Sequence, residues 1–182
     1  MSHARGTEYA AFDHLYSTTR ADLLAYLLRR APSTEDASEV LSETYLIAWR
    51  KLDAIPPGDK ARLWLFGVAR NLLLKHASRL RASNALVSRI TEELRASSTR
   101  LPDHAASPDA EHLVTALASL SELDREIVTL TAWEGLTPKE IAAVTGSSAN
   151  AVRIRLHRAR SRLQTQLAKD DVAHDPTTML AS

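Results

Sequence analysis

The sequence contains no cysteine, few glycines and no long hydrophobic run. The absence of cysteine excludes disulfides, thiolate zinc sites and cysteine-based redox sensing within this chain. Five glycines and two phenylalanines in 182 residues argue against a β-rich fold. No run approaches the roughly 18 apolar residues of a transmembrane helix, and residues 1–6 lack the apolar core of a secretion signal. We therefore expect a cytoplasmic protein that does not insert into a membrane.

The composition allows a substantial core, because 45% of the residues are hydrophobic and 25% are charged. The length fits one domain or two small ones. The formal net charge is only +1, so attraction to a nucleic acid has to come from local clusters of charge.

Apolar residues recur at helical spacing in two blocks that flank a weaker middle. The first block runs from Tyr9 to about Arg81 and is interrupted at residues 31–34 and 53–59, which predicts three or four helices. The middle holds two prolines and a Ser-Ser-Thr run, although residues 85–94 fit one short helix. The pattern predicts an all-α fold of two small helical domains, residues 8–82 and 111–168, joined by a flexible linker, 83–110, and followed by a frayed tail, 169–182.

The second block contains a helix-turn-helix pattern. Thr137-Pro138-Lys139-Glu140 has the form of a capping box that opens one helix, with proline in its first turn. Gly146 suits the left-handed conformation that ends a helix. Either Ser147 or Ser148 can then cap a second helix that runs to about Leu167.

This second helix has one apolar side and one basic side. Val152, Leu156 and Ala159, followed by Leu163, form an apolar stripe at helical spacing. A solvated surface helix is the alternative interpretation, but the caps, the glycine turn and the stripe in register favour DNA binding. Candidates for base edges or phosphates are Asn150, Arg153, Ile154, His157, Arg158 and Ser161, whereas Arg155, Arg160 and Arg162 lie at the flanks and suit backbone phosphate.

An acidic strip marks a helix predicted over residues 35–51, after a cap at Ser33 or Thr34. Asp36, Glu39 and Glu43 fall at i, i+3 and i+7 and therefore share one face. The helix macrodipole accounts for acids in the first turn, but it fades before Glu43. A basic protein partner is therefore as good an explanation of the strip as the macrodipole.

The segment 62–81 begins apolar and aromatic and ends basic. Aromatic residues beside cations serve single-stranded nucleic acid, whose bases stack while its phosphates pair with the cations. Burial in the core is the better explanation for Trp64, but it does not suit Asn71 beside Arg70.

Together, the three segments resemble the extracytoplasmic-function sigma factors, the small two-domain initiation subunits of bacterial RNA polymerase. Residues 36–49 resemble the family's polymerase-clamp-binding helix in region two, and residues 62–71 resemble its promoter-opening segment. Residues 120–167, with Ala151-Val152-Arg153 among them, resemble region four. The resemblance covers about residues 12–81 and 116–167. Ser42 stands where the family often has glutamine, and Lys75 where an acid is frequent.

The resemblance implies a role for each group of residues and implies no cofactor and no metal. Asp36, Glu39 and Glu43 are expected to face the coiled coil of the polymerase clamp, and region four the polymerase flap. The loop 53–61 is expected to capture a flipped base of the −10 element, which offsets the few kcal/mol that unstacking costs. The residues implied for the −10 element are Asp53, Lys60, Arg62, Arg70, Asn71 and Lys75; those implied for the −35 element are Asn150, Arg153, Ile154, Arg155, His157 and Arg158.

The implied partners are core RNA polymerase, promoter DNA and an anti-sigma factor, which in some cases holds its sigma factor at the membrane. Two other functions fit the sequence less well. A conventional helix-turn-helix regulator needs only the DNA-binding half, which leaves the acidic strip and the segment 62–71 unexplained. An enzyme needs a convergent constellation, and the seven histidines are scattered without metal-ligand spacing or a glycine-rich phosphate loop beside them.

Overall fold

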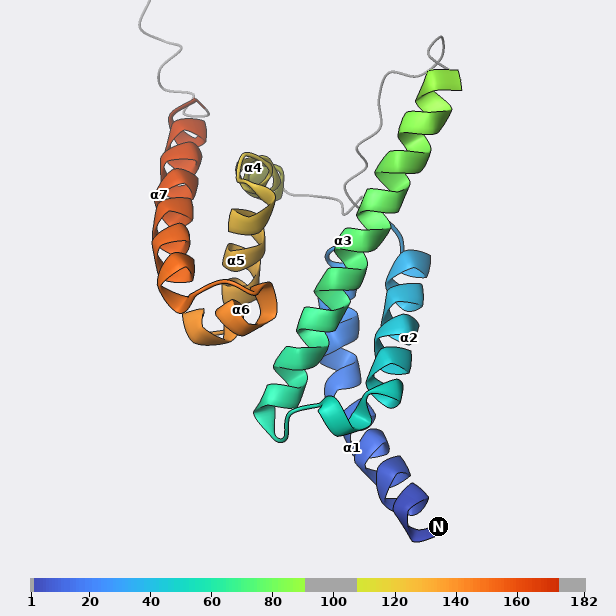
Figure 1. Ribbon diagram of the computed structural model, residues 1–182. Coiled ribbons are helices and arrows are strands. Elements are labelled where there is room, and N and C mark those ends of the chain that lie inside the picture. Colours follow the sequence, from blue (N-terminus) through green and yellow to red (C-terminus); the bar gives the residue numbers. More distant parts are fainter. Residues whose placement is uncertain (1, 91–107, 174–182) are drawn as a thin grey trace, which may run out of the picture. The chain divides into compact units, whose positions relative to one another are not determined.

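The computed structural model describes residues 2–90 and 108–173, with side chains described for 8–79 and 112–168. The described residues form seven α-helices and one 3-10 helix, and no strand occurs among them. The chain divides into two compact units, one built from α1 to α3 and the other from α4 to α7 (Figure 1). The predicted all-α fold is therefore confirmed.

The first unit is a bundle of three mutually packed helices, α1 (Ser2–Leu28), α2 (Thr34–Arg50) and α3 (Asp59–Ile90). A single 3-10 turn, η1 (Leu52–Ala54), interrupts the connection from α2 to α3. The rings of Tyr26 and Phe66 meet edge to face, with centroids 5.1 Å apart. Around this pair the buried core collects Leu23 and Leu27 from α1, Ala37, Val40, Thr44 and Ala48 from α2, and Leu65, Ala69 and Leu72 from α3.

The structure decides between the two candidate caps of α2 in favour of Ser33. The Ser33 hydroxyl accepts a hydrogen bond from the Asp36 backbone N–H at 3.0 Å and donates to Asp36 Oδ2 at 2.7 Å. This reciprocal arrangement satisfies one free N–H of the first turn and fixes the position of the Asp36 carboxylate.

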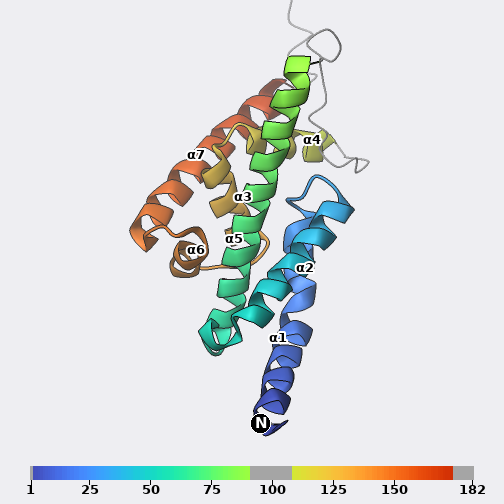
Figure 2. The ribbon, with the colours of Figure 1, turned by 45° about the vertical axis from the view of Figure 1, so that its right-hand side comes forward.

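Two helices run further than the sequence pattern predicts. Helix α3 continues to Ile90, past the predicted domain end at residue 82, and extends beyond α2 (Figure 2). Residues 81–90 contain neither proline nor glycine, so nothing in them breaks a helix that is already formed. Helix α7 (Ala149–Ala173) likewise passes residue 168, where a frayed tail was expected to follow. The rest of the predicted linker, residues 91–107, lies outside the described residues.

The second unit contains α4 (Pro108–Ala118), α5 (Glu122–Ala132), α6 (Pro138–Thr145) and α7, with α7 packed against both α4 and α5. The Arg125 side chain closes the corner between α4 and α5. It donates to the carbonyl oxygens of Leu117, Ala118 and Leu120 at 2.9–3.3 Å, and these oxygens lie at and just beyond the end of α4. Carbonyl oxygens at a helix end lack partners within the helix and are commonly satisfied in this way. The buried core of this unit is Ala116, Leu120, Ile127, Leu130, Leu136, Ile141, Val152, Leu156 and Ala159.

Among the described helices, none combines the length and the apolar character needed to cross a membrane.

Candidate nucleic-acid and protein interfaces

The turn between α6 and α7 has the geometry predicted for a helix-turn-helix. Thr137 and Glu140 form a complete capping box, in which the Thr137 N–H donates to Glu140 Oε2 at 2.8 Å. Gly146 ends α6 with φ +69°, the left-handed conformation, and the next N–H donates to the Ala142 carbonyl oxygen at 3.1 Å. Ser148, rather than Ser147, caps α7 by accepting from the Ala151 N–H at 3.1 Å.

The two faces of α7 separate as the apolar stripe predicts. Val152, Leu156 and Ala159 are buried against the rest of the unit, and Leu163 is half-buried. The opposite face is open to solvent, and even the apolar Ile154 is 44% exposed. All six residues predicted to reach base edges or phosphates, Asn150, Arg153, Ile154, His157, Arg158 and Ser161, are exposed.

Arg155 differs from the other arginines of α7 because α5 binds it. Its Nη1 donates to Asp124 Oδ1 at 2.9 Å, and the Asp124 side chain is only 13% exposed against 44% for Arg155. Desolvation alone would raise the pKa of Asp124. Hydrogen bonds from the Ser121 hydroxyl and from Arg155, with the charges of Arg155 and Arg162, outweigh desolvation and hold that pKa below its ordinary value. The ion pair fixes α7 against α5 and limits the freedom of Arg155 to reach DNA.

The acidic strip of α2 flanks the buried face of the helix. Glu39 is exposed, whereas Asp36 and Glu43 are half-buried. Glu43 reaches across to α3, where its Oε2 lies 3.3 Å from Nε2 of His76, a side chain only 14% exposed. The strip predicted from the sequence is thus a real surface. Its contact with His76 has no signal in the sequence, because the two residues are 33 positions apart.

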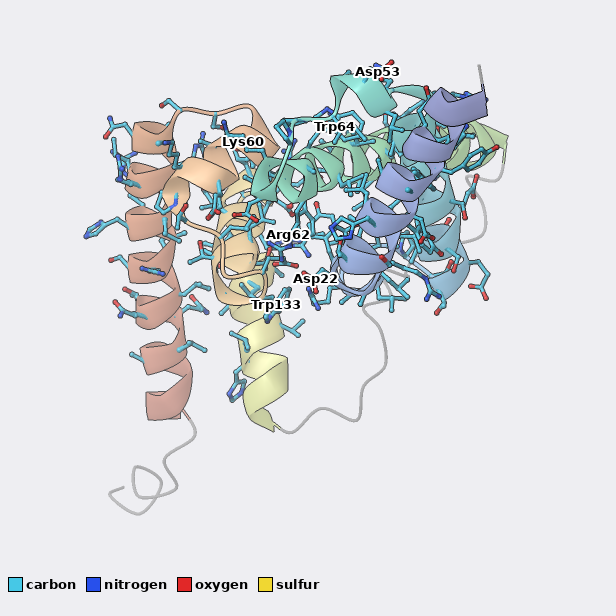
Figure 3. The ribbon with its side chains drawn as sticks, turned by 90° about the horizontal axis from the view of Figure 1, so that it is seen from below. Asp22, Asp53, Lys60, Arg62, Trp64 and Trp133 are labelled. Carbon is cyan, nitrogen blue, oxygen red and sulfur yellow. The ribbon has the colours of Figure 1, made fainter. Side chains whose placement is uncertain are left out.

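On α3, the residues predicted for the −10 element divide between two sides. Lys60, Asn71 and Lys75 are exposed at spacings of 11 and 4 residues, which places them on one face, and the half-buried Trp64 lies between them on that face. Arg62 points instead toward α1, where its Nε donates to Asp22 Oδ2 at 3.0 Å (Figure 3).

The remaining two predicted residues lie apart from that face. Arg70 is half-buried, and Asp53 is exposed on η1. The face formed by Lys60, Trp64, Asn71 and Lys75, here called the α3 row, thus combines one aromatic side chain with two cations and an amide, the set that suits single-stranded nucleic acid.

A cavity of about 620 Å³ opens between α1 and the loop that precedes α3. Apolar side chains make much of its wall, among them Leu15 from α1 and Ile55 and Pro56 from the loop, and the Thr18 side chain adds a hydroxyl. Six of the nine residues of the predicted base-capture loop, 53–61, line this cavity, namely Ile55, Pro56, Pro57, Gly58, Asp59 and Ala61.

The sequence reading also missed an aromatic cluster between α1 and α2. Three rings neighbour Phe12 and a fourth, that of Tyr9, packs on Trp49, with centroid separations of 4.7–6.4 Å between neighbouring rings. The Tyr45 hydroxyl is 2.8 Å from that of Thr19, and burial raises the pKa of Tyr45 above its ordinary value even though the Thr19 hydrogen bond acts to lower it. The cluster consists of Tyr9, Phe12, Tyr16, Tyr45 and Trp49.

Comparison with known proteins assigns a class to each unit. Residues 15–83 match the family described as Sigma-70 region 2, and residues 110–163 match Sigma-70, region 4. The fold and these two matches together define a sigma-70-type transcription initiation factor that has regions two and four.

Individual relatives narrow the class. The ECF RNA polymerase sigma factor SigL of Mycobacterium tuberculosis is 32% identical over 171 residues, which cover 92% of this chain and 94% of SigL. The sigma factor RpoE of Bartonella quintana, solved in complex with the anti-sigma factor NepR, aligns with a TM-score of 0.63 and 26% identity over 86% of this chain and 96% of RpoE. CnrH, solved in complex with the cytosolic domain of CnrY, aligns with a TM-score of 0.60 and 27% identity, over 87% and 88% of the two chains.

The chain belongs to the extracytoplasmic-function family of RNA polymerase sigma factors. It is an alternative sigma factor, which binds core RNA polymerase and directs promoter-specific initiation of transcription.

Proposed function

We propose that residues 111–168 hold the −35 element through the exposed face of α7. The observation that carries this assignment is the division of α7 into a buried stripe and an open basic face within a correctly capped helix-turn-helix. A helix of this kind fits the major groove of B-DNA, where arginine forms its commonest specific contact with guanine. Arg153 and Arg158 are the cations for base edges or nearby phosphates. Arg155, which is bound to Asp124, serves as a phosphate contact and as the anchor of α7.

Residues 8–82 bind the −10 element through two neighbouring features of the first unit, the α3 row and the cavity beside the loop 53–61. The α3 row supplies Trp64 and Asn71 for the bases of the separated strand, with Lys60 and Lys75 for its phosphates. The cavity beside the loop is large enough for a single base, and its apolar wall replaces the stacking that the base loses when it leaves the duplex. Arg62 contributes by holding α1 to α3 through Asp22 at the edge of this cavity.

Asp36, Glu39 and Glu43 form the contact with the coiled coil of the polymerase clamp. Glu39 is exposed and Asp36 and Glu43 are half-buried beside it, while Ala37, Val40, Thr44 and Ala48 fix the helix in the core. This arrangement gives a rigid anionic surface, which favours fast association with a basic partner and a defined orientation on it.

Control by an anti-sigma factor follows from the solved relatives, since RpoE was solved with NepR and CnrH with the cytosolic domain of CnrY. We extend this mode of control to the present chain, which then acts in the cytoplasm and is held at the membrane only when its inhibitor is anchored there. The chain itself supplies binding and DNA opening and no catalytic step. Residues 83–110 connect regions two and four inside the polymerase.

Runoff transcription with purified chain and core polymerase tests these assignments. Glu39→Ala is expected to weaken binding to core, whereas Asp13→Ala, which removes an exposed acid from α1, is the matched control and leaves it unchanged. Asn71→Ala is expected to retain core binding and closed complexes but to slow opening, measured by permanganate reactivity of unpaired thymines. Equal core binding by Glu39→Ala and Asp13→Ala contradicts the role of the strip. Normal opening by Asn71→Ala contradicts that of the α3 row.

A further inference from the structure

The strip of α2 and the imidazole of His76 converge into one cluster of ligand atoms. One ligand atom each from Asp36, Glu39 and His76 lies within 4.8 Å of the other two. Beside them, Glu43 Oε2 lies 3.3 Å from His76 Nε2, at hydrogen-bond distance. These donors come from two different helices, and the imidazole sits at the packed seam between them with 14% of its side chain exposed. The cluster is therefore a mixed nitrogen and oxygen set, unlike a row of acids on one solvated helix.

The separations are close to those that a metal ion requires. Bonds of about 2.1 Å to nitrogen and oxygen place tetrahedral ligand atoms about 3.4 Å apart. The ligand atoms of Asp36, Glu39 and His76 lie within 4.8 Å of one another, so rotation of the side chains has to bring them to this spacing when the ion binds. The 3.3 Å contact between Glu43 Oε2 and His76 Nε2 is a hydrogen-bond distance, and a carboxylate in this position orients an imidazole that binds a metal ion. The Ser33 hydroxyl binds Oδ2 of Asp36, which leaves the other oxygen open and orients the carboxylate as an outer hydrogen bond does in metal sites.

We propose that Asp36, Glu39 and His76 bind one divalent transition-metal ion of the zinc class between α2 and α3, with Glu43 orienting the imidazole. The imidazole favours zinc and its neighbours in the series over magnesium and calcium, which prefer oxygen ligands alone. A cation also relieves the repulsion among three carboxylates at i, i+3 and i+7 on one helix. The ion fastens α2 to α3 on the surface that carries the acidic strip.

This site has a consequence for transcription that rests on the proposed contact with the polymerase clamp. A bound divalent ion neutralises most of the charge that the strip offers to a basic coiled coil and occupies its carboxylate oxygens. The metal-loaded chain is therefore expected to bind core polymerase more weakly than the metal-free chain.

Zinc chloride added to the full-length, chelator-treated chain tests the site directly, by calorimetry and by competition with a chromophoric chelator. The wild type is expected to bind one zinc ion in preference to magnesium. His76→Gln and Glu39→Gln are each expected to lower the affinity at least about tenfold, since even outer-shell changes cost that much. Glu39 is exposed, so its substitution leaves the core intact. Cobalt(II) in place of zinc is expected to give an absorption spectrum typical of nitrogen and oxygen ligands.

Two control variants separate this site from weak binding elsewhere. Glu35→Gln removes an acid from the same helix outside the cluster, and His112→Gln removes a histidine from the other unit. Both are expected to keep the wild-type affinity. Zinc affinity that is equal in wild type, His76→Gln and Glu39→Gln, or a preference for magnesium, overturns the proposal.

Core binding measured with and without zinc tests the regulatory consequence separately. Zinc is expected to weaken binding of the wild type and to have little effect on His76→Gln, which keeps all three carboxylates. Tight zinc binding with unchanged affinity for core polymerase overturns the proposed competition between zinc and polymerase, but not the metal site itself. Loss of core binding by Glu39→Ala supports the contact between the acidic strip and the polymerase clamp, whatever the outcome of the zinc experiments.

Discussion

The ion pair between Asp124 and Arg155 allows a quantitative test of how α7 is anchored. Asp124→Asn removes the charge while keeping the shape and a side-chain oxygen for the Ser121 hydroxyl. Arg155→Gln removes the other partner. Fully exposed pairs contribute about 0.2–1 kcal/mol, and hydrogen bonds to charged groups about 1.5–3 kcal/mol. Because Asp124 is 13% and Arg155 44% exposed, we expect a coupling of about 1 kcal/mol between them.

The assay is a double-mutant cycle on the full-length chain, read by native-state hydrogen exchange of the α5 and α7 amides. Glu122→Gln is the control for Asp124→Asn, since it removes an exposed acid from the first turn of the same helix. The coupling is expected to shrink in about 1 M salt, where the Debye length is about 3 Å. A coupling that cannot be distinguished from zero, or equal losses for Asp124→Asn and Glu122→Gln, refutes the reasoning.

The lowered pKa of Asp124 adds a pH dependence with a definite sign. A carboxyl whose pKa is lower in the folded than in the unfolded state stabilises the fold fully only above its unfolded pKa, about 3.9. That stability is lost as the pH falls through the lower, folded-state value. The protection of α5 is therefore expected to fall in acid more steeply in the wild type than in Asp124→Asn, and parallel profiles contradict the assignment.

Three further predictions concern single residues. Gly146→Ala is expected to lower the free energy of opening α6, measured by hydrogen exchange, by about 1–2 kcal/mol, because alanine disfavours a φ of +69°. A new Cβ meets no atom within 4 Å, so the backbone conformation is the whole cost. Gly146→Asn is expected to cost less, because asparagine tolerates this conformation. Tyr45→Phe is expected to cost about 1 kcal/mol in denaturant unfolding, because the bond to Thr19 is lost. The same change is expected to remove from the ultraviolet titration a tyrosine that ionises above its ordinary pKa. Arg158→Ala is expected to weaken binding of the holoenzyme to promoter DNA by about 1–3 kcal/mol and to relax the base preference at one position of the −35 element. Binding to a promoter library measures both effects. An unchanged base preference at every −35 position contradicts a base contact by Arg158.

The sequence predicted features that depend on residues within one or two helical turns. The capping box of Thr137 and Glu140, the left-handed Gly146 and the buried stripe of Val152, Leu156 and Ala159 all follow from spacing along a single helix. The all-α fold was equally predictable, since helical periodicity extends over most of the chain. These local rules also placed the acidic strip on one face of α2.

Local rules were less reliable at helix ends and for partly buried side chains. Helix α3 runs to Ile90 because no proline or glycine stops it, although weak apolar patterning suggested a linker from residue 83. The choice between Ser147 and Ser148 as a cap also needed the structure, since either hydroxyl fits the spacing. Trp64 was expected in the core but is half-buried and lies in the α3 row.

By itself, then, the sequence determined that the fold is helical, where several helices begin and which faces carry charge, because these properties are set by neighbours three to seven positions away. Only the tertiary structure decided the pairs Asp22 with Arg62, Glu43 with His76 and Asp124 with Arg155, which lie 40, 33 and 31 positions apart. Such pairs depend on how each helix is rotated and how it packs against the next, which core contacts fix and spacing along one helix does not. These pairs tie Arg62 to α1, Arg155 to α5 and His76 to the acidic strip.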